Sequence, residues 1–158
     1  MNQLISNLDL HAKGLWFPVS MSIILLLIVI FIPKKNINWK EIYITFGIIA
    51  FITWFCDGLI GRVFNLLDLG NPKLTGLGEI FCYTFIPTSL AILYLNYFTK
   101  QNKWRLAAIF ILLSLGIDIG MKLSGYMVFH EWSLVHSIIV YFFTYGFFLP
   151  FHIRFIRS

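Results

Sequence analysis

Five apolar stretches, separated by short polar segments, run through the chain. They cover about residues 15–33, 41–60, 79–98, 104–121 and 133–151. Each stretch approaches the roughly 20 residues with which an α-helix crosses the hydrocarbon core of a bilayer. The pattern therefore predicts an all-α fold, a polytopic membrane bundle of about five transmembrane helices that forms a single integral membrane domain over residues 1–158.

The composition supports a membrane protein and argues against a soluble domain. Hydrophobic residues make up 59% of the 158 residues and charged residues 12%, whereas a soluble domain of this length needs far more polar surface to cover its core. The first apolar stretch is longer than the core of a signal peptide and lacks a cleavage site of small residues, and Lys34 and Lys35 follow it directly. We therefore expect it to be a retained transmembrane helix.

Basic residues orient the predicted helices, because cytoplasmic loops carry an excess of Lys and Arg. One side holds eight, namely Lys34, Lys35, Lys40, Lys100, Lys103, Arg105, Arg154 and Arg157. The other side holds four, namely Lys13, Arg62, Lys73 and Lys122. This split predicts an N-terminus outside and a C-terminus in the cytoplasm, in the cell membrane, which we take to be a bacterial cytoplasmic membrane. The net charge of +5 then needs no nucleic acid, and the expected partners are the lipid bilayer and other membrane proteins.

Acidic residues gather on the predicted outer side, although the topology does not require it. Of the seven, only Glu41 falls on the cytoplasmic side. The outer ones near helix ends are Asp57, Glu79 and Asp118, and those in outer segments are Asp9, Asp68 and Glu131. Ionisable groups at membrane depth are costly and usually face protein or water. The sequence therefore predicts a polar cluster at the outer end of the bundle.

The spacing of these residues indicates which of them meet. Asp118 and Lys122 are four apart, on one helix face, with the acid first, which is the favourable order. Asp57 and Arg62 are five apart, a poorer match for an α-helix unless it ends near Gly61. The last helix carries a polar stripe of the kind that faces other helices: Ser133, His136, Ser137, Tyr141, Thr144 and Tyr145. We expect Asp118 and Lys122 to face the bundle interior, with Glu79 or His136 within reach.

These residues form the predicted ligand-binding set, around a hydrated cavity open to the outside. The set is Asp57, Arg62, Glu79, Asp118, Lys122, Glu131 and His136. Three alternatives remain open: interfacial ion pairs, a capping role for Glu79 at its helix N-terminus and a packing role for His136. No metal-binding spacing, phosphate-binding loop or catalytic motif is present. We therefore expect neither a metal nor a cofactor and assign no catalytic residue.

Two cysteines and one long connection complete the outer end. Cys56 and Cys82 fall near the outer ends of two helices joined by one loop, so we expect them at similar depth on neighbouring helices. A disulfide on an oxidising face is one alternative, and two reduced thiols are the expected state. The connection over residues 61–79 could cover the cavity as a lid or serve as a passive connector.

The second and third stretches can be laid over the fourth and fifth as a weak repeat. "CDGLIGR" then matches "IDIGMK", and Glu79 matches Glu131. Parallel repeats of this kind build some transporter folds around a central site. The sequence thus suggests two helix hairpins in weak repeat plus one extra helix, with chance similarity as the alternative.

Two longer segments, "IPTSLAILYLNYFTKQNKWR" and "MKLSGYMVFHEWSLVHSIIVYFFTYGFFLPFHIRF", carry a resemblance. Together they are similar to an uncharacterised group of small five-span membrane proteins from endospore-forming Firmicutes. The matching residues are Pro87, Leu95, Asn96, Tyr97, Lys122, Gly125, Tyr126, Trp132, Ser137 and Tyr141. Ile86, Phe129 and His130 depart from that group's pattern, in which tyrosine is usual at these places. The resemblance implies the fold and a bacterial host, and it implies no chemistry.

Three classes of function remain after the sequence has been read. The first is a small carrier, channel or binding protein whose outer cavity holds a cation, a proton or a polar headgroup. The second is a non-catalytic subunit or scaffold of a membrane complex, in which the polar residues hold helices together. The third is a membrane enzyme that acts on a lipid or isoprenoid headgroup by acid–base chemistry.

Overall fold

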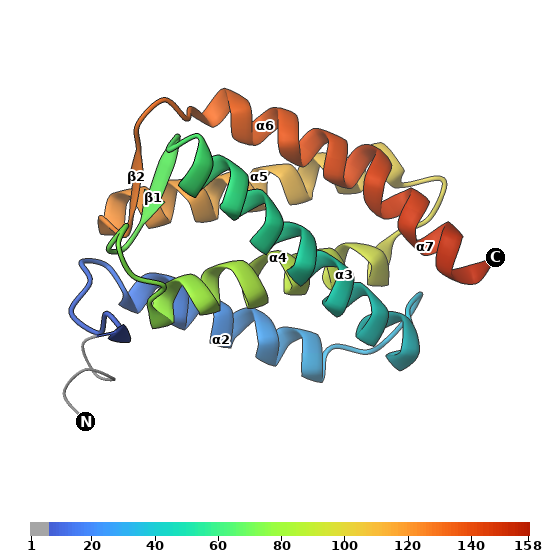
Figure 1. Ribbon diagram of the computed structural model, residues 1–158. Helices are drawn as coiled ribbons and strands as arrows, with labels where there is room; N and C mark the ends of the chain where they lie inside the picture. The colour runs from blue at the N-terminus through green and yellow to red at the C-terminus, as the bar shows by residue number, and fades with distance from the viewer. Residues whose placement is uncertain (1–6) are drawn as a thin grey trace.

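The computed structural model describes residues 7–158 as a bundle of helices whose axes run roughly along one direction (Figure 1). The helices are α2 (Trp16–Phe31), α3 (Trp39–Asp57), α4 (Leu77–Tyr97), α5 (Lys103–Ser124), α6 (Leu134–Phe143) and α7 (Leu149–Arg157). Two π-helical segments, η1 (Gly58–Val63) and η2 (Thr144–Phe148), extend α3 and join α6 to α7.

Four of these helical segments are long and apolar enough to cross a membrane, which confirms the predicted membrane helix bundle. They are Trp39–Val63, Leu77–Tyr97, Lys103–Ser124 and Leu134–Arg157. The fifth apolar helix, α2, has 16 residues and spans about 24 Å at 1.5 Å per residue, less than the roughly 30 Å of a bilayer core. It ends before "IPKK", where Ile32 is already extended, as expected of a residue that precedes proline.

Helix α4 is the centre of the bundle. It packs against α2 on one side and α3 on the other, whereas α5 packs mainly against α6. In the most apolar 18-residue segment of α4, 61% of the residues are buried, whereas the corresponding segment of α3 and η1 has 11% of its residues buried. The helices at the periphery of the bundle therefore present most of their apolar side chains to lipid, whereas α4 packs its apolar side chains against other helices.

A proline in α4 creates one of the contacts that hold α3 in place. Pro87 has no N–H, so the Tyr83 carbonyl one turn earlier loses its helical partner. Thr53 on α3 supplies the replacement, and its hydroxyl donates to the Tyr83 carbonyl at 2.7 Å. In hydrocarbon such a carbonyl must find an internal donor, so this proline fixes α3 against α4.

Two short strands, which the sequence pattern did not predict, close one end of the bundle. β1 (Leu67–Leu69) and β2 (Met127–Phe129) pair antiparallel, with Asp68 opposite Val128. β1 lies in the α3–α4 connection and β2 in the α5–α6 connection, so the order helix–strand–helix occurs twice. We call this the outer end, and the opposite end, near the C-terminus, the inner end (Figure 1).

The strand pair agrees with the suggested repeat and corrects one match within it. Asp57 precedes β1 by ten residues, and Asp118 precedes β2 by nine. Glu79 is the third residue of α4, but Glu131 lies before α6, whose third residue is His136. Glu79 and Glu131 are therefore not equivalent, because α6 begins after Ser133 rather than at Glu131.

The orientation of the bundle in the membrane is testable by labelling. Asn71 follows β1 and is exposed at the outer end, whereas Gln101, in the connection between α4 and α5, is exposed at the inner end. In a Cys56→Ser background, we expect Asn71→Cys to react with a membrane-impermeant thiol reagent added to intact cells. Gln101→Cys should react only after lysis. Labelling in the opposite sense would invert the topology and place the acidic cluster on the cytoplasmic side.

Candidate functional site

A pocket of about 220 Å³ opens at the outer end, beside the strand pair. Its wall includes three acidic residues and one basic residue, namely Asp57, Asp68, Glu79 and Arg62. β1 contributes the wall on one side through Leu67 and Leu69, so the connection over residues 61–79 lines the pocket. Because β1 is paired with β2, this connection is a fixed wall of the pocket.

The π-helical turn explains how Asp57 and Arg62 meet despite their five-residue spacing. In a π-helix the hydrogen bonds join residues five apart, and such turns often occur at functional sites. Along η1 the Arg62 Nε lies 3.7 Å from Asp57 Oδ2. A Cβ atom at Gly61 would stand 2.8 Å from Asp57 Oδ1, so glycine leaves the space that the Asp57 carboxylate occupies.

A single guanidinium serves both buried carboxylates of the pocket. Arg62 Nη2 lies 3.2 Å from Glu79 Oε2 on α4 and also donates to the Thr75 hydroxyl at 2.8 Å. The Asp57 and Glu79 side chains are each 8% exposed, whereas Arg62 is 47% exposed. Two carboxylates facing one cation leave one negative charge uncompensated at the edge of the hydrocarbon region.

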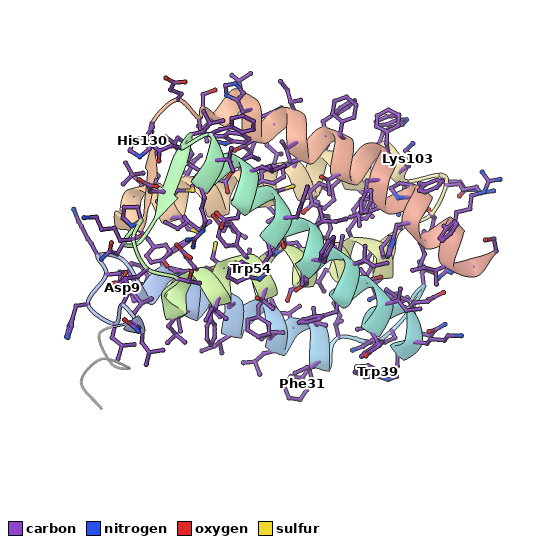
Figure 2. All side chains as sticks on the ribbon, viewed as in Figure 1. Asp9, Phe31, Trp39, Trp54, Lys103 and His130 are labelled. Atoms are coloured by element: carbon purple, nitrogen blue, oxygen red, sulfur yellow. The ribbon has the colours of Figure 1, made fainter. Side chains whose placement is uncertain are left out.

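The third carboxylate of the pocket belongs to the strand pair. Asp68 Oδ2 lies 2.7 Å from His130 Nε2, which comes directly after β2. His130 is labelled at the outer end in Figure 2, and Trp39 and Lys103 lie toward the inner end. This pair joins the two outer connections beside the pocket.

Asp118 forms a second buried acidic site. Its carboxylate accepts from the Tyr141 hydroxyl on α6 at 2.8 and 2.9 Å, one distance to each oxygen, and Ser137 lies nearby. Asp118 is 6% exposed, and within residues 7–158 no basic side chain forms an ion pair with it. The prediction that Asp118 faces the interior is therefore correct.

The prediction that Lys122 accompanies Asp118 into the interior is wrong. Lys122 is exposed, and its Nζ lies 4.9 Å from the centre of the Phe129 ring. It occupies the last turn of α5, which Gly125 ends in a left-handed conformation. There the ammonium group stays exposed to solvent and lies over an aromatic ring, with which it forms a cation–π interaction. This position costs less free energy than burial of the charge. Neither Glu79 nor His136 forms a hydrogen bond or ion pair with Asp118, because Glu79 pairs with Arg62 and His136 with Ser133.

The two acidic sites are similar in construction. In each hairpin an aspartate near the outer end of the first helix faces a tyrosine about two turns into the second. Tyr83 lies near Asp57, and the Tyr141 hydroxyl donates to Asp118. The sites are also close, since Cys82, next to Tyr83, contacts Met121 with 3.5 Å between the sulfur atoms.

The remaining predicted residues lie outside both sites. His136 caps its own helix, with Nδ1 2.8 Å from the Ser133 hydroxyl, and Glu131 is exposed without an ion pair to any described residue. Cys56 is exposed and Cys82 buried, and both are free thiols. They lie on neighbouring helices, as expected.

Sequence reasoning left five residues of these sites out of the predicted set: Asp68, Tyr83, His130, Ser137 and Tyr141. Tyr141 and Ser137 belong to the polar stripe of the last helix, but the stripe alone did not single them out. The available signal was the aspartate-to-tyrosine spacing, which is 26 residues from Asp57 to Tyr83 and 23 from Asp118 to Tyr141. The pairing of Asp68 with His130 depends on the register of the two strands, which no local sequence pattern predicts.

Comparison with known proteins adds no further assignment. No protein-family model matches the chain, and neither a curated protein nor a solved structure matches it. In the part of the chain that the structure describes, no group of three His, Cys, Asp or Glu side chains could hold a metal ion. The likeness to the Firmicutes group stays a prediction.

Proposed function

We propose that this protein is a small proton-binding carrier or channel of the bacterial cell membrane, which takes up protons through the outer pocket. The observation that carries the proposal is the sharing of one guanidinium by two buried carboxylates, Asp57 and Glu79. Either carboxylate can be balanced by Arg62, and the other then needs a cation from the solution.

The energetic argument starts from the cost of an unbalanced charge. By membrane-insertion measurements an aspartate at the centre of a transmembrane helix costs about 2.5–3.5 kcal/mol, and a smaller cost applies to Asp57 and Glu79, which lie at helix ends. A proton removes that cost without requiring a coordination shell, and the pocket opens to the side from which the proton would arrive. Arg62 is half-exposed, so its side chain has room to move when the charge of its partners changes.

Asp118 favours the proton over larger cations. Its carboxyl group is enclosed by Tyr141 and Ser137 and has no ion-pair partner within residues 7–158. A carboxyl group buried in this way is most stable when it is neutral. We propose that protons pass from the outer pocket toward Asp118, with the Tyr83 and Tyr141 hydroxyl groups as hydrogen-bonding partners along the way.

Glu79→Gln tests the outer pocket. We expect the purified protein, in liposomes that enclose a pH-sensitive dye, to carry protons when a potassium diffusion potential is imposed. Glutamine keeps a carbonyl acceptor for Arg62 and cannot take up a proton, so flux through Glu79→Gln should fall to the level of empty liposomes. Glu131→Gln, an exposed carboxylate outside the pocket, is the matched control and should retain wild-type flux.

Two outcomes would overturn this proposal. Wild-type protein that carries no more protons than empty liposomes would remove it, and the polar residues would then fit the scaffold alternative, in which they hold helices together. Flux through Glu79→Gln equal to that of the wild type would show that protons do not use the outer pocket.

A further inference from the structure

The inner end holds a larger hollow, of about 690 Å³, which the proton site does not involve. It lies where the loop after α2 meets the start of α3 and the end of α7. Its charged lining residues are Lys34, Lys35, Glu41 and Arg157. Three basic groups against one carboxylate give this hollow a net positive charge.

The loop that presents the two lysines is fixed by side chains of other segments. Asn96 of α4, which is 1% exposed, accepts from the Lys35 amide at 2.7 Å and donates to the Pro33 carbonyl at 3.0 Å. Asn36 donates to the Phe98 carbonyl at 3.3 Å. A loop ordered before binding loses little entropy when a ligand arrives.

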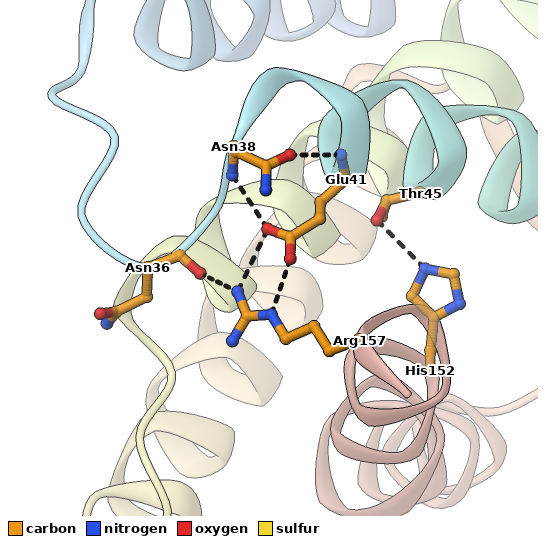
Figure 3. A network of polar contacts seen from close by, with 6 residues as sticks. All are labelled: Asn36, Asn38, Glu41, Thr45, His152 and Arg157. Carbon is orange, nitrogen blue, oxygen red and sulfur yellow. Dashed lines mark hydrogen bonds and ion pairs between the residues drawn. The ribbon is translucent and has the colours of Figure 1, made fainter.

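Arg157 and Glu41 neutralise each other within the hollow. Arg157 donates from Nε to Glu41 Oε1 at 2.7 Å and from Nη2 to Oε2 at 3.1 Å. Figure 3 shows this pair, with Asn38 capping the start of α3 through Glu41 and with Arg157 also donating to the Asn36 carbonyl. The excess positive charge therefore resides on the two lysines.

The two lysines differ in how many hydrogen bonds their ammonium groups already donate within the protein. Lys34 Nζ donates to three carbonyls at the end of α2, those of Val29, Ile30 and Ile32. Lys35 Nζ makes no hydrogen bond or ion pair to a residue within 7–158, and it lies 5.3 Å from the centre of the Tyr97 ring. Lys35 thus has donors to offer a ligand, while Lys34 contributes charge.

We propose that this inner hollow binds the phosphate group of an anionic phospholipid. Exposed Trp39 lines it, and tryptophan at a helix end marks the level of the lipid headgroups. Basic pockets between transmembrane helices on the cytoplasmic side bind anionic headgroups. Phe31 and Tyr43, both strongly exposed near the hollow along the chain, offer apolar surface to acyl chains, which a free phosphate ion would not use.

The test is lipid binding measured by native mass spectrometry on the full-length protein in detergent. Phosphatidylglycerol should bind more tightly than phosphatidylcholine. Lys35→Gln should weaken phosphatidylglycerol binding about fivefold, the equivalent of the roughly 1 kcal/mol that one lysine contributes near an anionic surface. Lys100→Gln, another exposed lysine of the inner end that does not line the hollow, should bind as the wild type does.

The lipid and the free ion are distinguished in the same experiment. Inorganic phosphate at millimolar concentration should leave phosphatidylglycerol bound. Displacement of the lipid by phosphate would overturn the lipid assignment in favour of the free ion. Equal binding of the two lipids, or of wild type and Lys35→Gln, would overturn the site itself. Thermal unfolding of Lys35→Gln at the wild-type temperature excludes misfolding, and no outcome depends on proton flux.

Discussion

Asp118→Asn is expected to abolish proton flux in liposomes while the protein remains folded. Asparagine has the shape of aspartate and keeps one oxygen to accept from the Tyr141 hydroxyl, which now spans both carboxylate oxygens at 2.8 and 2.9 Å. An amide cannot take up a proton, so a path through Asp118 would end there. The exchange keeps the volume of the side chain and one hydrogen-bond acceptor, so stability should not fall by more than about 1 kcal/mol, the net worth of one hydrogen bond.

Glu131→Gln is the control for this variant, because Glu131 is an exposed carboxylate that does not line the outer pocket. It should retain most of the flux. Proton flux through Asp118→Asn at the wild-type rate would exclude Asp118 from the path and leave it a structural role alone. Infrared difference spectra between acid and alkaline pH give a second measurement, since a carboxyl band assigned to Asp118 should vanish only in Asp118→Asn.

Gly78→Ala is expected to destabilise the outer end strongly, although it adds only one methyl group. A Cβ atom there would stand 2.2 Å from the Tyr126 hydroxyl oxygen and 2.6 Å from Leu15 Cδ1. Tyr126 is buried, and this burial, reinforced by nearby negative charges, raises the pKa of its phenol. The ring is enclosed and cannot simply turn away, so we expect a loss of about 1–3 kcal/mol, typical of an overpacked core.

The measurement is unfolding in detergent, followed by the reactivity of buried Cys82 with a thiol reagent in a Cys56→Ser background. Gly47→Ala is the control, because a Cβ atom at Gly47 meets nothing within 4 Å. Alanine favours a helix over glycine by up to about 1 kcal/mol, so Gly47→Ala should be neutral or stabilising. Equal stability of Gly78→Ala and Gly47→Ala would mean that Tyr126 can move, and that α4 does not depend on this close contact.

The predicted helices were largely right because their signal is local and strong. Runs of apolar residues long enough to cross a bilayer have few alternative structures, since every backbone N–H and C=O in hydrocarbon needs an internal partner. The first stretch shows the limit of this signal, because α2 stops at Phe31, before the proline that the apolar run includes. Length and hydropathy predicted a helix there and overestimated its extent.

The candidate site was predicted in part, and its two halves differ for a physical reason. Asp57, Arg62 and Glu79 meet as expected, although a π-helical turn rather than a helix end brings Asp57 to Arg62. The rule that residues four apart share a helix face led to the wrong partner for Asp118. That rule describes an isolated helix, whereas the partner of Asp118, Tyr141, comes from another helix. Lys122 instead lies over the ring of Phe129 in the strand pair.

The sequence by itself determined the class of the protein, its helices and the gathering of acidic residues at one end. These follow from transfer energies and local periodicity, which depend on residues near one another in the chain. Only the tertiary structure decided which charges meet: Arg62 with both Asp57 and Glu79, Asp118 with Tyr141, and Arg157 with Glu41. Most of these partners lie on different helices, and a partner across the bundle is selected by how the helices pack, which no local pattern encodes.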